Sequence, residues 1–485
     1  MSLSFEQEPV NATSKVPVIT NWTPAIGYML FYDASIAAFF YFKLILEVRL
    51  TDASGTLLGK IKQRRNGYSD DVFNNKARAF FDLKELANTQ LIDTVIDQND
   101  TGVPFRTIHK VGANTTAKPF SVNGDSSTGK TQIIALYVKG YYEKSDAANA
   151  SPTEVTGGAI NDTLYYLQAS LPLMTPRSTV TSPVGFIQGT DFNVFNGNGA
   201  TDRFLSDLET SSGDYNITGY INYVQETDYH TVAFLNDNSN FASNIARVNI
   251  SYYNSAGTLI GGTSYSFFNN NAAGGSDPTT ETNTDAERLV YFGAGPGNLE
   301  AQTAFAGAKP SNSAGWAYYV VKGTDAFTLA RTANYYFIKQ DGSCKGFKVR
   351  RLAWRNSVGG YDYFNFKKKS TQTVEVQRNN YSTMLGTFNK SQWRYNNTQR
   401  GKTTRQTTAV LKETLNTDWI SEQDGNLLEK LLMSTSVYIV ENADTTYTEA
   451  VMITDSSHVR KTVANDRMIR YTINIEYANP LNTNS

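Results

Sequence analysis

The sequence predicts a mostly β protein made of several β-sandwich modules, of immunoglobulin or fibronectin type, with a C-terminal α+β unit similar to a split barrel. The chain has 485 residues, too many for one hydrophobic core, and its length suggests about three domains. Charged residues make up only 18% of the chain, while Tyr and Phe number 29 and 26. This composition is more typical of β-rich extracellular or virion proteins than of cytosolic enzymes. Short apolar strands recur about every ten residues, which is the pattern of sandwich modules.

The clearest element is a β-meander in the last third of the chain. Apolar and basic residues alternate over 347–354, a turn with two glycines follows at 356–360, and aromatic residues return among polar neighbours over 361–366. Period-two alternation around an Asn/Gly turn is the strongest short-range signal for a β-hairpin. A third strand is expected over 371–377, after the basic run 367–369.

The N-terminal part predicts an extended arm and a first sandwich. Residues 1–25 are polar and without periodicity, and we expect them to dock on a neighbouring subunit. Residues 26–150 are expected to form the first β-sandwich, with a short helix over 82–90. Its predicted strands cover 27–32, 39–50, 56–62 and 131–142.

A second β-sandwich region is expected over 159–385, after a segment at 145–158 that has the composition of a linker. The polar loop 269–286 divides this region into two modules, 159–268 and 287–385. The predicted strands cover 215–223, 230–235, 245–253, 289–292, 316–322, 330–340 and those of the meander.

Two shorter features fall inside these regions. The segment 254–261 repeats the pattern of 52–59, with a turn followed by an apolar return strand, and predicts the same hairpin in both sandwiches. The segment 203–208 is predicted to form a helical turn.

Residues 386–485 are expected to form the C-terminal α+β domain. Ser421 is an N-cap candidate, with Asp424 three residues later in a short form of the capping box. Four leucines then follow at helical spacing. Strands are predicted over 403–415, 437–441, 450–454 and 468–477. The predicted structural core residues of the meander and this domain are Leu352, Trp354, Tyr363, Phe366, Leu428 and Leu431.

Charge and residue counts exclude several classes of site. The formal net charge is −1, so the whole chain has no general attraction to nucleic acid or to an anionic membrane. Cys344 is the only cysteine, which excludes an internal disulfide and a cysteine-based metal site. The three histidines, His109, His230 and His458, are far apart in the sequence. We therefore predict no metal site and no cofactor.

The sequence also predicts that the chain is not inserted in a membrane. The N-terminal residues include acidic side chains where a signal peptide needs a basic start and an apolar core. The most apolar stretch, 28–50, is interrupted by Asp33, Lys43 and Glu47 and is too short in apolar residues to span a bilayer. We expect synthesis and assembly in the cytoplasm.

One segment matches the P-loop pattern. Gly124, Gly129, Lys130 and Thr131 have the spacing of a nucleotide-binding loop, in which backbone amides cradle phosphates and the lysine reaches the terminal phosphate. A P-loop must follow a buried strand and open a helix. Here Pro119 weakens the preceding strand, and the residues that follow are β-branched and aromatic. We interpret the match as chance in a surface hairpin loop.

Three other motifs have simpler interpretations. The glycine-rich segment 292–298 lacks dinucleotide-loop spacing and is expected to be a turn. The segment 97–102 resembles the start of a calcium loop, but Ile108 occupies the position of the final carboxylate, so an Asx-rich turn is favoured. No nucleophile elbow, carboxylate pair or catalytic triad is recognisable, which predicts a non-enzymatic protein.

The meander also carries a candidate basic patch. Lys367, Lys368 and Lys369 with Arg350, Arg351 and Arg355 are its basic residues. Tyr361 and Tyr363 are candidates for stacking on bases or sugars. The favoured interpretation is a solvated strand face or a contact between subunits.

Several segments resemble a family of bacteriophage virion proteins found in tail and baseplate gene neighbourhoods. The similar segments are LAWRNSVGGYDYFNF (352–366), KKKSTQTVEVQR (367–378), SEQDGNLLEKLLMSTSVYIVE (421–441), ITDSS (453–457) and RYTINIEYAN (470–479). Arg355 stands where the family is expected to have an apolar residue. The resemblance covers about the last 200 residues and implies a structural protein near the tail tip or connector, with no catalytic residues.

The expected function is therefore a structural component of a tailed-phage virion, in the tail, baseplate or connector. The expected partners are other tail proteins and further copies of the chain in a ring of about three, six or twelve. Neither nucleic acid binding nor membrane insertion is expected. The first alternative is a receptor-binding tail module that recognises host surface glycan through exposed Tyr and Asn loops. The second is a nucleotide-binding protein, which rests on the P-loop match alone.

Overall fold

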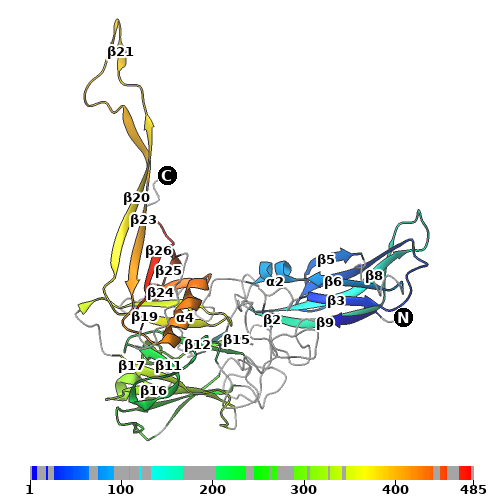
Figure 1. Ribbon diagram of the computed structural model, residues 1–485, viewed down its shortest axis with the longest axis horizontal. Helices are drawn as coiled ribbons and strands as arrows, with labels where there is room; N and C mark the ends of the chain where they lie inside the picture. Colours follow the sequence, from blue (N-terminus) through cyan, green and yellow to red (C-terminus); the bar gives the residue numbers. More distant parts are fainter. Residues whose placement is uncertain are drawn as a thin grey trace. The chain divides into compact units, whose positions relative to one another are not determined.

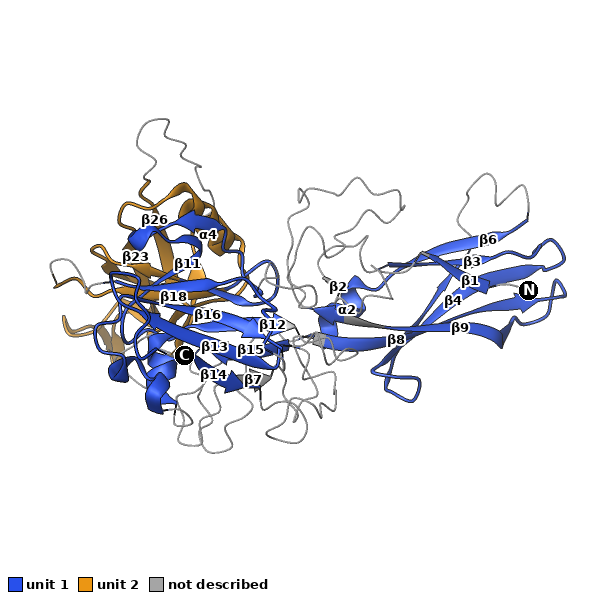
Figure 2. Ribbon diagram, turned by 90° about the horizontal axis from the view of Figure 1, so that it is seen from below, with its two compact units in different colours: residues 1–341, 355–363 blue, residues 342–354, 364–485 orange. Residues whose placement is uncertain are grey.

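The computed structural model describes part of the chain, in two compact units (Figure 2). Unit 1 comprises residues 1–341 and 355–363, and unit 2 comprises 342–354 and 364–485. The described residues are 3–7, 18–19, 27–64, 75–91, 109, 120–122, 133–167, 204–235, 245–262, 264–269, 289–302, 306–325, 328–340, 346–440, 448–455 and 469–481.

The first part of unit 1 is a β-sandwich (Figure 1). Its smaller sheet has the order β1-β3-β6, formed by Leu3–Gln7, Gly27–Tyr32 and Ala77–Asp82. Its larger sheet has the order β2-β9-β8-β4-β5, formed by Val18–Ile19, Thr153–Leu167, Ile133–Ser145, Tyr41–Leu50 and Leu57–Gln63. The helix α2, Lys84–Gln90, buries Ala87.

Alternation of side chains builds the core of this sandwich. Leu44, Leu46 and Val48 of β4 point inward and are fully buried. Leu30 of β3, in the opposite sheet, belongs to the same core and is also fully buried. At Gly140 of β8 the two sheets approach closely, because a Cβ there would lie 2.5 Å from the Leu30 side chain. The sheets therefore pack through a continuous apolar layer.

Two predicted boundaries of this sandwich are wrong. The residues Leu3–Gln7 do not belong to an extended arm, because they pair with β3 as an edge strand. The expected linker 145–158 is a hairpin turn followed by the start of β9, which continues the larger sheet to Leu167. The first sandwich therefore extends beyond residue 150.

The second part of unit 1 also has two sheets. The larger has the order β10-β11-β17-β16-β13-β14, formed by Thr210–Ser212, Thr218–Val224, Tyr335–Lys339, Tyr318–Thr324, Arg247–Tyr253 and Tyr265–Phe268. The smaller has the order β12-β15-β7, formed by Thr231–Leu235, Leu289–Gly293 and Phe120–Val122. Helix α3 is Pro296–Ala301, and 3-10 turns cover Asp214–Asn216, Ala306–Ala308 and Pro310–Asn312.

Aromatic side chains join these two sheets. The Phe267 ring of β14 lies 5.5 Å from the Phe292 ring of β15. The hydroxyl of Tyr319, on β16, donates a hydrogen bond of 2.8 Å to the carbonyl of Ala294. The predicted helical turn at 203–208 is wrong, because residues 204–208 form neither a helix nor a hydrogen-bonded turn and have only a bend at Leu205.

The predicted turn is present in both sandwiches, but the predicted return strand forms only in the first, as β5, whereas the second has a single bridge between Tyr253 and Leu259. The carboxylate of Asp52 accepts the backbone N–H of Ser54 at 2.7 Å, and the side-chain oxygen of Asn254 accepts that of Ala256 at 3.0 Å. Each is an Asx turn between two antiparallel segments.

Unit 2 is built on one seven-stranded sheet with the order β19-β18-β24-β25-β26-β23-β20. The strands are Tyr361–Phe366, Arg350–Arg355, Val437–Val440, Thr448–Ile453, Thr472–Tyr477, Lys402–Asn416 and Thr371–Ser382. The turn that joins β18 to β19 belongs to unit 1. A small hairpin, β21 (Thr387–Asn389) and β22 (Gln392–Arg394), lies between β20 and β23.

The predicted amphipathic helix is confirmed as α4, Glu422–Met433. The Ser421 hydroxyl accepts the Asp424 backbone N–H at 3.1 Å, and the Asp424 carboxylate accepts the Ser421 backbone N–H at 3.3 Å. This reciprocal pair is a capping box. Leu427, Leu428 and Leu431 form the buried face.

The predicted fold class, mostly β with sandwich modules and a C-terminal α+β unit, is confirmed. The expected domain boundary at 385/386 is wrong, because it lies inside unit 2, where β20 pairs with β23 of the same sheet over its whole length. In the described part of the chain, helices are too short or too polar to cross a membrane.

Candidate functional site

The most distinctive feature of unit 2 is a long β-hairpin, residues 371–416, which we call the arm (Figure 1). Strands β20 and β23 pair from Thr371 opposite Thr414 to Ser382 opposite Lys402. The neighbouring strand β26 pairs with β23 only over Lys412–Asn416. Farther out, β20 and β23 continue as a two-stranded ribbon. At about 3.3 Å per residue, the length of β20 corresponds to roughly 40 Å.

Strand β20 of the arm is exposed along its length. All twelve residues of β20 are exposed, whereas β23 changes from exposed side chains at Lys402 to fully buried Leu415 in the body of the sheet. An isolated two-stranded hairpin is only marginally stable in water. Such a hairpin therefore favours a role that covers it in an assembly.

The arm tip, residues 383–401, has an ordered structure of its own. Phe388 of β21 pairs with Trp393 of β22. The indole N–H of Trp393 donates a hydrogen bond of 2.8 Å to the Leu385 carbonyl. Gly386, between them, has a φ of 99°, and a Cβ there would lie 2.4 Å from the Trp393 nitrogen. Only glycine fits this close turn without strain.

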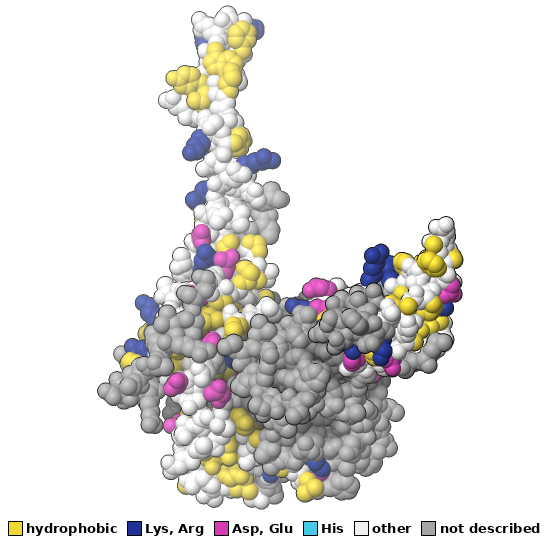
Figure 3. Space-filling view, turned by 45° about the vertical axis from the view of Figure 1, so that its right-hand side comes forward, with side chains coloured by type: hydrophobic (Ala, Val, Ile, Leu, Met, Phe, Trp, Pro, Cys, Tyr) yellow, Lys and Arg dark blue, Asp and Glu magenta, His cyan; other side chains and the backbone are white. Residues whose placement is uncertain are grey.

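Large apolar side chains gather at the arm tip (Figure 3). The tip residues concerned are Met384, Leu385, Phe388, Trp393 and Tyr395. Their exposed fractions range from 41% for Leu385 to 78% for Met384. A cluster of exposed aromatic and apolar side chains marks an interaction surface.

The distal arm, which we define as residues 376–411, has only one sign of charge. It contains no Asp or Glu. Its basic residues are Arg378, Lys390, Arg394, Arg400, Lys402 and Arg405. At the base of the arm the charge is balanced, because Lys412 pairs with Glu375 at 2.5 Å. The positive charge is therefore concentrated on the projecting part.

A buried ion pair fixes the base of the arm to the body of unit 2. Glu413 of β23 is 1% exposed and accepts a hydrogen bond of 2.8 Å from Arg350 of β18. Gln372 and Tyr477 donate to its other oxygen at 3.1 and 2.8 Å. Burial alone would raise the pKa of the Glu413 carboxyl, but the hydrogen bond from Arg350 and those from its other neighbours hold it below its usual value.

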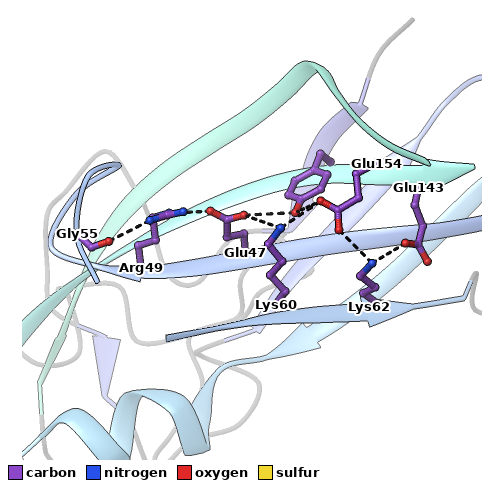
Figure 4. Close-up of polar contacts among 8 residues, drawn as sticks. Glu47, Arg49, Gly55, Lys60, Lys62, Glu143 and Glu154 are labelled. Atoms are coloured by element: carbon purple, nitrogen blue, oxygen red, sulfur yellow. Dashed lines mark hydrogen bonds and ion pairs between the residues drawn. The ribbon is translucent and has the colours of Figure 1, made fainter. Parts of the chain in front are cut away.

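A second group of charges lies on the first sandwich of unit 1 (Figure 4). The ladder consists of Glu47, Arg49, Lys60, Lys62, Glu143 and Glu154 on β4, β5, β8 and β9. Lys62 lies 2.6 Å from Glu143 and 3.1 Å from Glu154. Burial would raise the pKa of the Glu143 carboxyl, but the Lys62 hydrogen bond lowers it overall. These carboxylates stay ionised at neutral pH, so the ladder is suited to structure and not to proton transfer.

Two of the three histidines meet in unit 1, which the sequence did not predict. The Tyr363 hydroxyl lies 2.7 Å from Nδ1 of His109 and 2.6 Å from Oγ1 of Thr231. The His230 ring packs 4.2 Å from the Tyr363 ring, measured between centroids. Asn298 donates to the His109 carbonyl at 3.1 Å and accepts the His230 backbone N–H at 2.7 Å. Both histidines are buried, and this cluster connects four chain segments through hydrogen bonds in the core.

Two carboxylates meet at the turn between β18 and β19. Asp362 accepts hydrogen bonds from the Ser206 hydroxyl at 2.5 Å and from the Asp207 backbone N–H at 2.8 Å. Asp207 in turn accepts the Ser357 backbone N–H at 2.8 Å. Burial, and then the nearby Asp207 charge, raise the pKa of Asp362 to about 7.

This raised pKa predicts a loss of stability between pH 5 and pH 8. The Asp362 pKa is higher in the folded state than the usual value of about 3.9. Its stabilising contribution is therefore complete below the unfolded pKa of about 3.9 and is lost as the pH rises from there through about 7. In wild type, the free energy of unfolding of unit 1 should fall over this range by an amount on the order of a few kcal/mol, and the denaturant midpoint should fall with it.

The variant Asp362→Asn tests this expectation. Its carbonyl oxygen can accept the Asp207 N–H, and its amide can donate to the Ser206 hydroxyl. The variant should show a much smaller fall in denaturant midpoint between pH 5 and pH 8 than wild type. An equal fall in both proteins would show that Asp362 does not titrate in this range.

Neither a protein-family model nor a curated protein sequence matches this chain. Function must therefore be inferred from the residues themselves.

The candidate stacking residues and part of the candidate basic patch are not available at the surface. Tyr361 and Tyr363 are 2% and 6% exposed, so neither the alternative of stacking on bases or sugars nor the favoured interpretation as a solvated strand face holds for them. Arg350, Arg351 and Arg355 are buried, because every residue of β18 is buried. Arg351 donates to the Asn365 side chain at 2.8 Å.

The lysines of that candidate patch remain near the surface. Lys368 is partly exposed and pairs with Asp418 at 2.8 Å, and Lys369 is exposed. The exposed basic residues are concentrated instead on the distal arm.

The other predicted sites have different outcomes. The six predicted core residues, Leu352, Trp354, Tyr363, Phe366, Leu428 and Leu431, are all buried. The P-loop match Gly124, Gly129, Lys130 and Thr131, the segment 97–102 and His458 lie outside the described residues. The glycine-rich segment 292–298 is the turn from β15 into α3, with Gly295 packed against the His230 backbone. Among the described residues, no cluster of His, Cys, Asp or Glu has the composition of a metal site.

Proposed function

We propose that this chain is a non-enzymatic structural component of a tailed-phage virion, in the tail, baseplate or connector. The arm is the observation that supports this most directly. It is a projecting ribbon with an ordered, apolar tip, and such a device is useful where a neighbouring subunit covers it. The proposal includes assembly with other virion proteins and with further copies of the chain, in a symmetric ring.

The other polar clusters also support a structural role. The charge ladder, the buried histidine cluster and the Glu413 ion pair consist of groups whose partners hold them in place. A catalytic site instead needs a reactive group that can reach a substrate. The clusters described here connect strands within each unit, which suits a protein that must resist force.

The size of the purified full-length chain tests the assembly proposed here. Light scattering after size exclusion should give a closed oligomer of about three, six or twelve copies, and negative-stain images of the same peak should show a ring. Mass spectrometry of purified phage particles should find the chain at a stoichiometry that matches this ring. Absence from the particles would contradict the proposed function.

Recognition of host glycan is a second candidate function. The exposed Phe388, Trp393 and Tyr395 rings favour it, since aromatic faces also stack on sugars. Glycan-array binding that is lost in Trp393→Ala, by a chain that is monomeric, would support this function over a scaffold role.

A further inference from the structure

We propose that the distal arm docks on unit 1 of a second copy of this chain. This inference rests on the proposed function in so far as both require assembly, and it identifies the partner surface. The arm would bind through its apolar tip and its basic side chains together. Three properties of the chain lead to it.

The first property is the composition of the arm. The cores of protein interfaces are enriched in Tyr, Trp, Phe, Met and Arg and depleted in Asp and Glu. The tip presents Met384, Phe388, Trp393 and Tyr395, and the distal arm has four arginines and no acidic residue. Trp, Tyr and Arg are also the residues that most often dominate binding energy. The arm is therefore composed as one side of an interface.

The second property is that the tip is ordered before it binds. The Trp393 indole is held by the Leu385 carbonyl at 2.8 Å, and the Thr383 hydroxyl donates to the Arg400 carbonyl at 2.7 Å. The backbone N–H of Thr383 also donates to the Gly401 carbonyl at 2.8 Å. These contacts fix the tip while its apolar side chains stay exposed. The tip therefore loses less conformational entropy when a partner binds it.

The third property is the distribution of charge between the units. The distal arm has six basic and no acidic residues. Unit 1 has 25 Lys and Arg against 33 Asp and Glu, a net charge of 25 − 33 = −8. Unit 2 outside the distal arm has 13 basic and 12 acidic residues and is close to neutral. Counted over the sequence, unit 1 is therefore the part of the chain whose net charge is opposite to that of the arm, and every copy of the chain carries both.

The same distribution favours a second copy over nucleic acid. A nucleic acid strand would be attracted by the arm but repelled by the negative charge of unit 1. A second copy presents unit 1 as the attractive surface and also offers apolar area to the tip. Because the arm of one copy meets a different surface of the next, the contact is heterologous and can close a ring.

Photo-cross-linking at the arm tip identifies the partner directly. A photoreactive phenylalanine analogue replaces Phe388 in the full-length chain, and light and isotope-heavy chains are mixed before irradiation. Because Phe388 is 67% exposed, the replacement should not disturb folding. We expect peptides that join position 388 of one isotope to unit 1 of the other. Cross-links only within a chain, only to unit 2, or to co-purified nucleic acid would each overturn the proposal.

Charge reversal tests the electrostatic part. The double variant Arg394→Glu/Arg400→Glu should weaken self-association by about tenfold or more, measured by sedimentation. The control Lys369→Glu/Lys430→Glu makes the same charge change in the body of unit 2 and should weaken it less than about threefold. Equal weakening by both variants, or by neither, would contradict docking through the arm.

The apolar part has its own test. Phe388→Ala removes an exposed ring and leaves the Trp393 hydrogen bond intact, so the tip should remain folded. Self-association should weaken by about tenfold. Wild-type association in this variant would show that the tip is not buried in the contact. Failure of the proposed function is a separate result, because a chain absent from phage particles can still self-associate through the arm.

Discussion

Replacing Leu431 by Asp is expected to abolish the cooperative folding of unit 2. Leu431 lies on the buried face of α4 and has no exposed surface. A carboxylate at this position would be buried with no cation provided for it, or it would be protonated at a large cost. The helix would also lose the packing of a full leucine side chain. Together these effects should destabilise unit 2 by more than about 4 kcal/mol.

The same helix offers a matched control. Met433, two residues later, is 53% exposed, so Met433→Asp adds the same charge to the same helix without burying it. In urea unfolding followed by tryptophan fluorescence, Trp354, Trp393 and Trp419 report unit 2, whereas Trp316 reports unit 1. Met433→Asp should keep the transition of unit 2, and Leu431→Asp should lose it and keep only that of unit 1. A normal transition in Leu431→Asp would mean that α4 does not pack as described.

The local strand pattern was predictable from the sequence because short runs rich in β-branched and aromatic residues, some of them alternating with period two, lie between turn residues. Strands β3 and β19 have the predicted bounds, and most others differ by a few residues at their ends. The capping box at Ser421 was also predictable, since both of its hydrogen bonds form between residues three apart. Signals of this kind depend only on neighbours in the chain.

Which strands pair with one another was not predictable from such local signals. The strand at Thr371 was expected to continue a meander, but it pairs with β23, and the polar residues between them form the arm tip. The start of β9 has few apolar residues and the composition of a linker, yet its backbone pairs with β8. In both cases ladder hydrogen bonds, which carry no side-chain signature, decide the structure.

The candidate site shows the same division. The basic residues of the distal arm are visible in the sequence, but their concentration matters only because β20 and β23 pair and project. The basic patch was interpreted as a solvated strand face or a contact between subunits, whereas Arg350 and Arg351 are both buried with polar partners. The meeting of His109 and His230 at Tyr363 has no local signal, because the contacts span more than a hundred residues of sequence.

Removing the charge of Glu413 should loosen the base of the arm from the body of unit 2. The variant Glu413→Gln would leave the Arg350 guanidinium buried beside a neutral amide. Breaking a buried ion pair by removing one partner typically costs about 3–5 kcal/mol, since the remaining charge stays buried without compensation. This change should destabilise unit 2. Because β23 continues from Glu413 into the arm, the arm should also lose its fixed direction.

The exposed pair at the same level of the arm provides the control. Glu375 pairs with Lys412 on the surface, so Glu375→Gln changes the same residue type in the neighbouring strand. Its urea midpoint should stay close to that of wild type. If both variants lost stability equally, burial of Glu413 would not be the cause.

The pH dependence of the stability of unit 2 tests the Glu413 ion pair independently. Hydrogen bonding holds the pKa of folded Glu413 below its usual value. The stabilisation is therefore complete above the unfolded pKa of about 4.3 and is lost as the pH falls through the lower, folded pKa. Wild-type unit 2 should lose stability on this acidic limb, whereas Glu413→Gln should be less stable at neutral pH and should lose less on acidification. A parallel acid limb in the two proteins would show that the pKa of Glu413 is the same in the folded and unfolded states, so that Arg350 does not stabilise its ionised form.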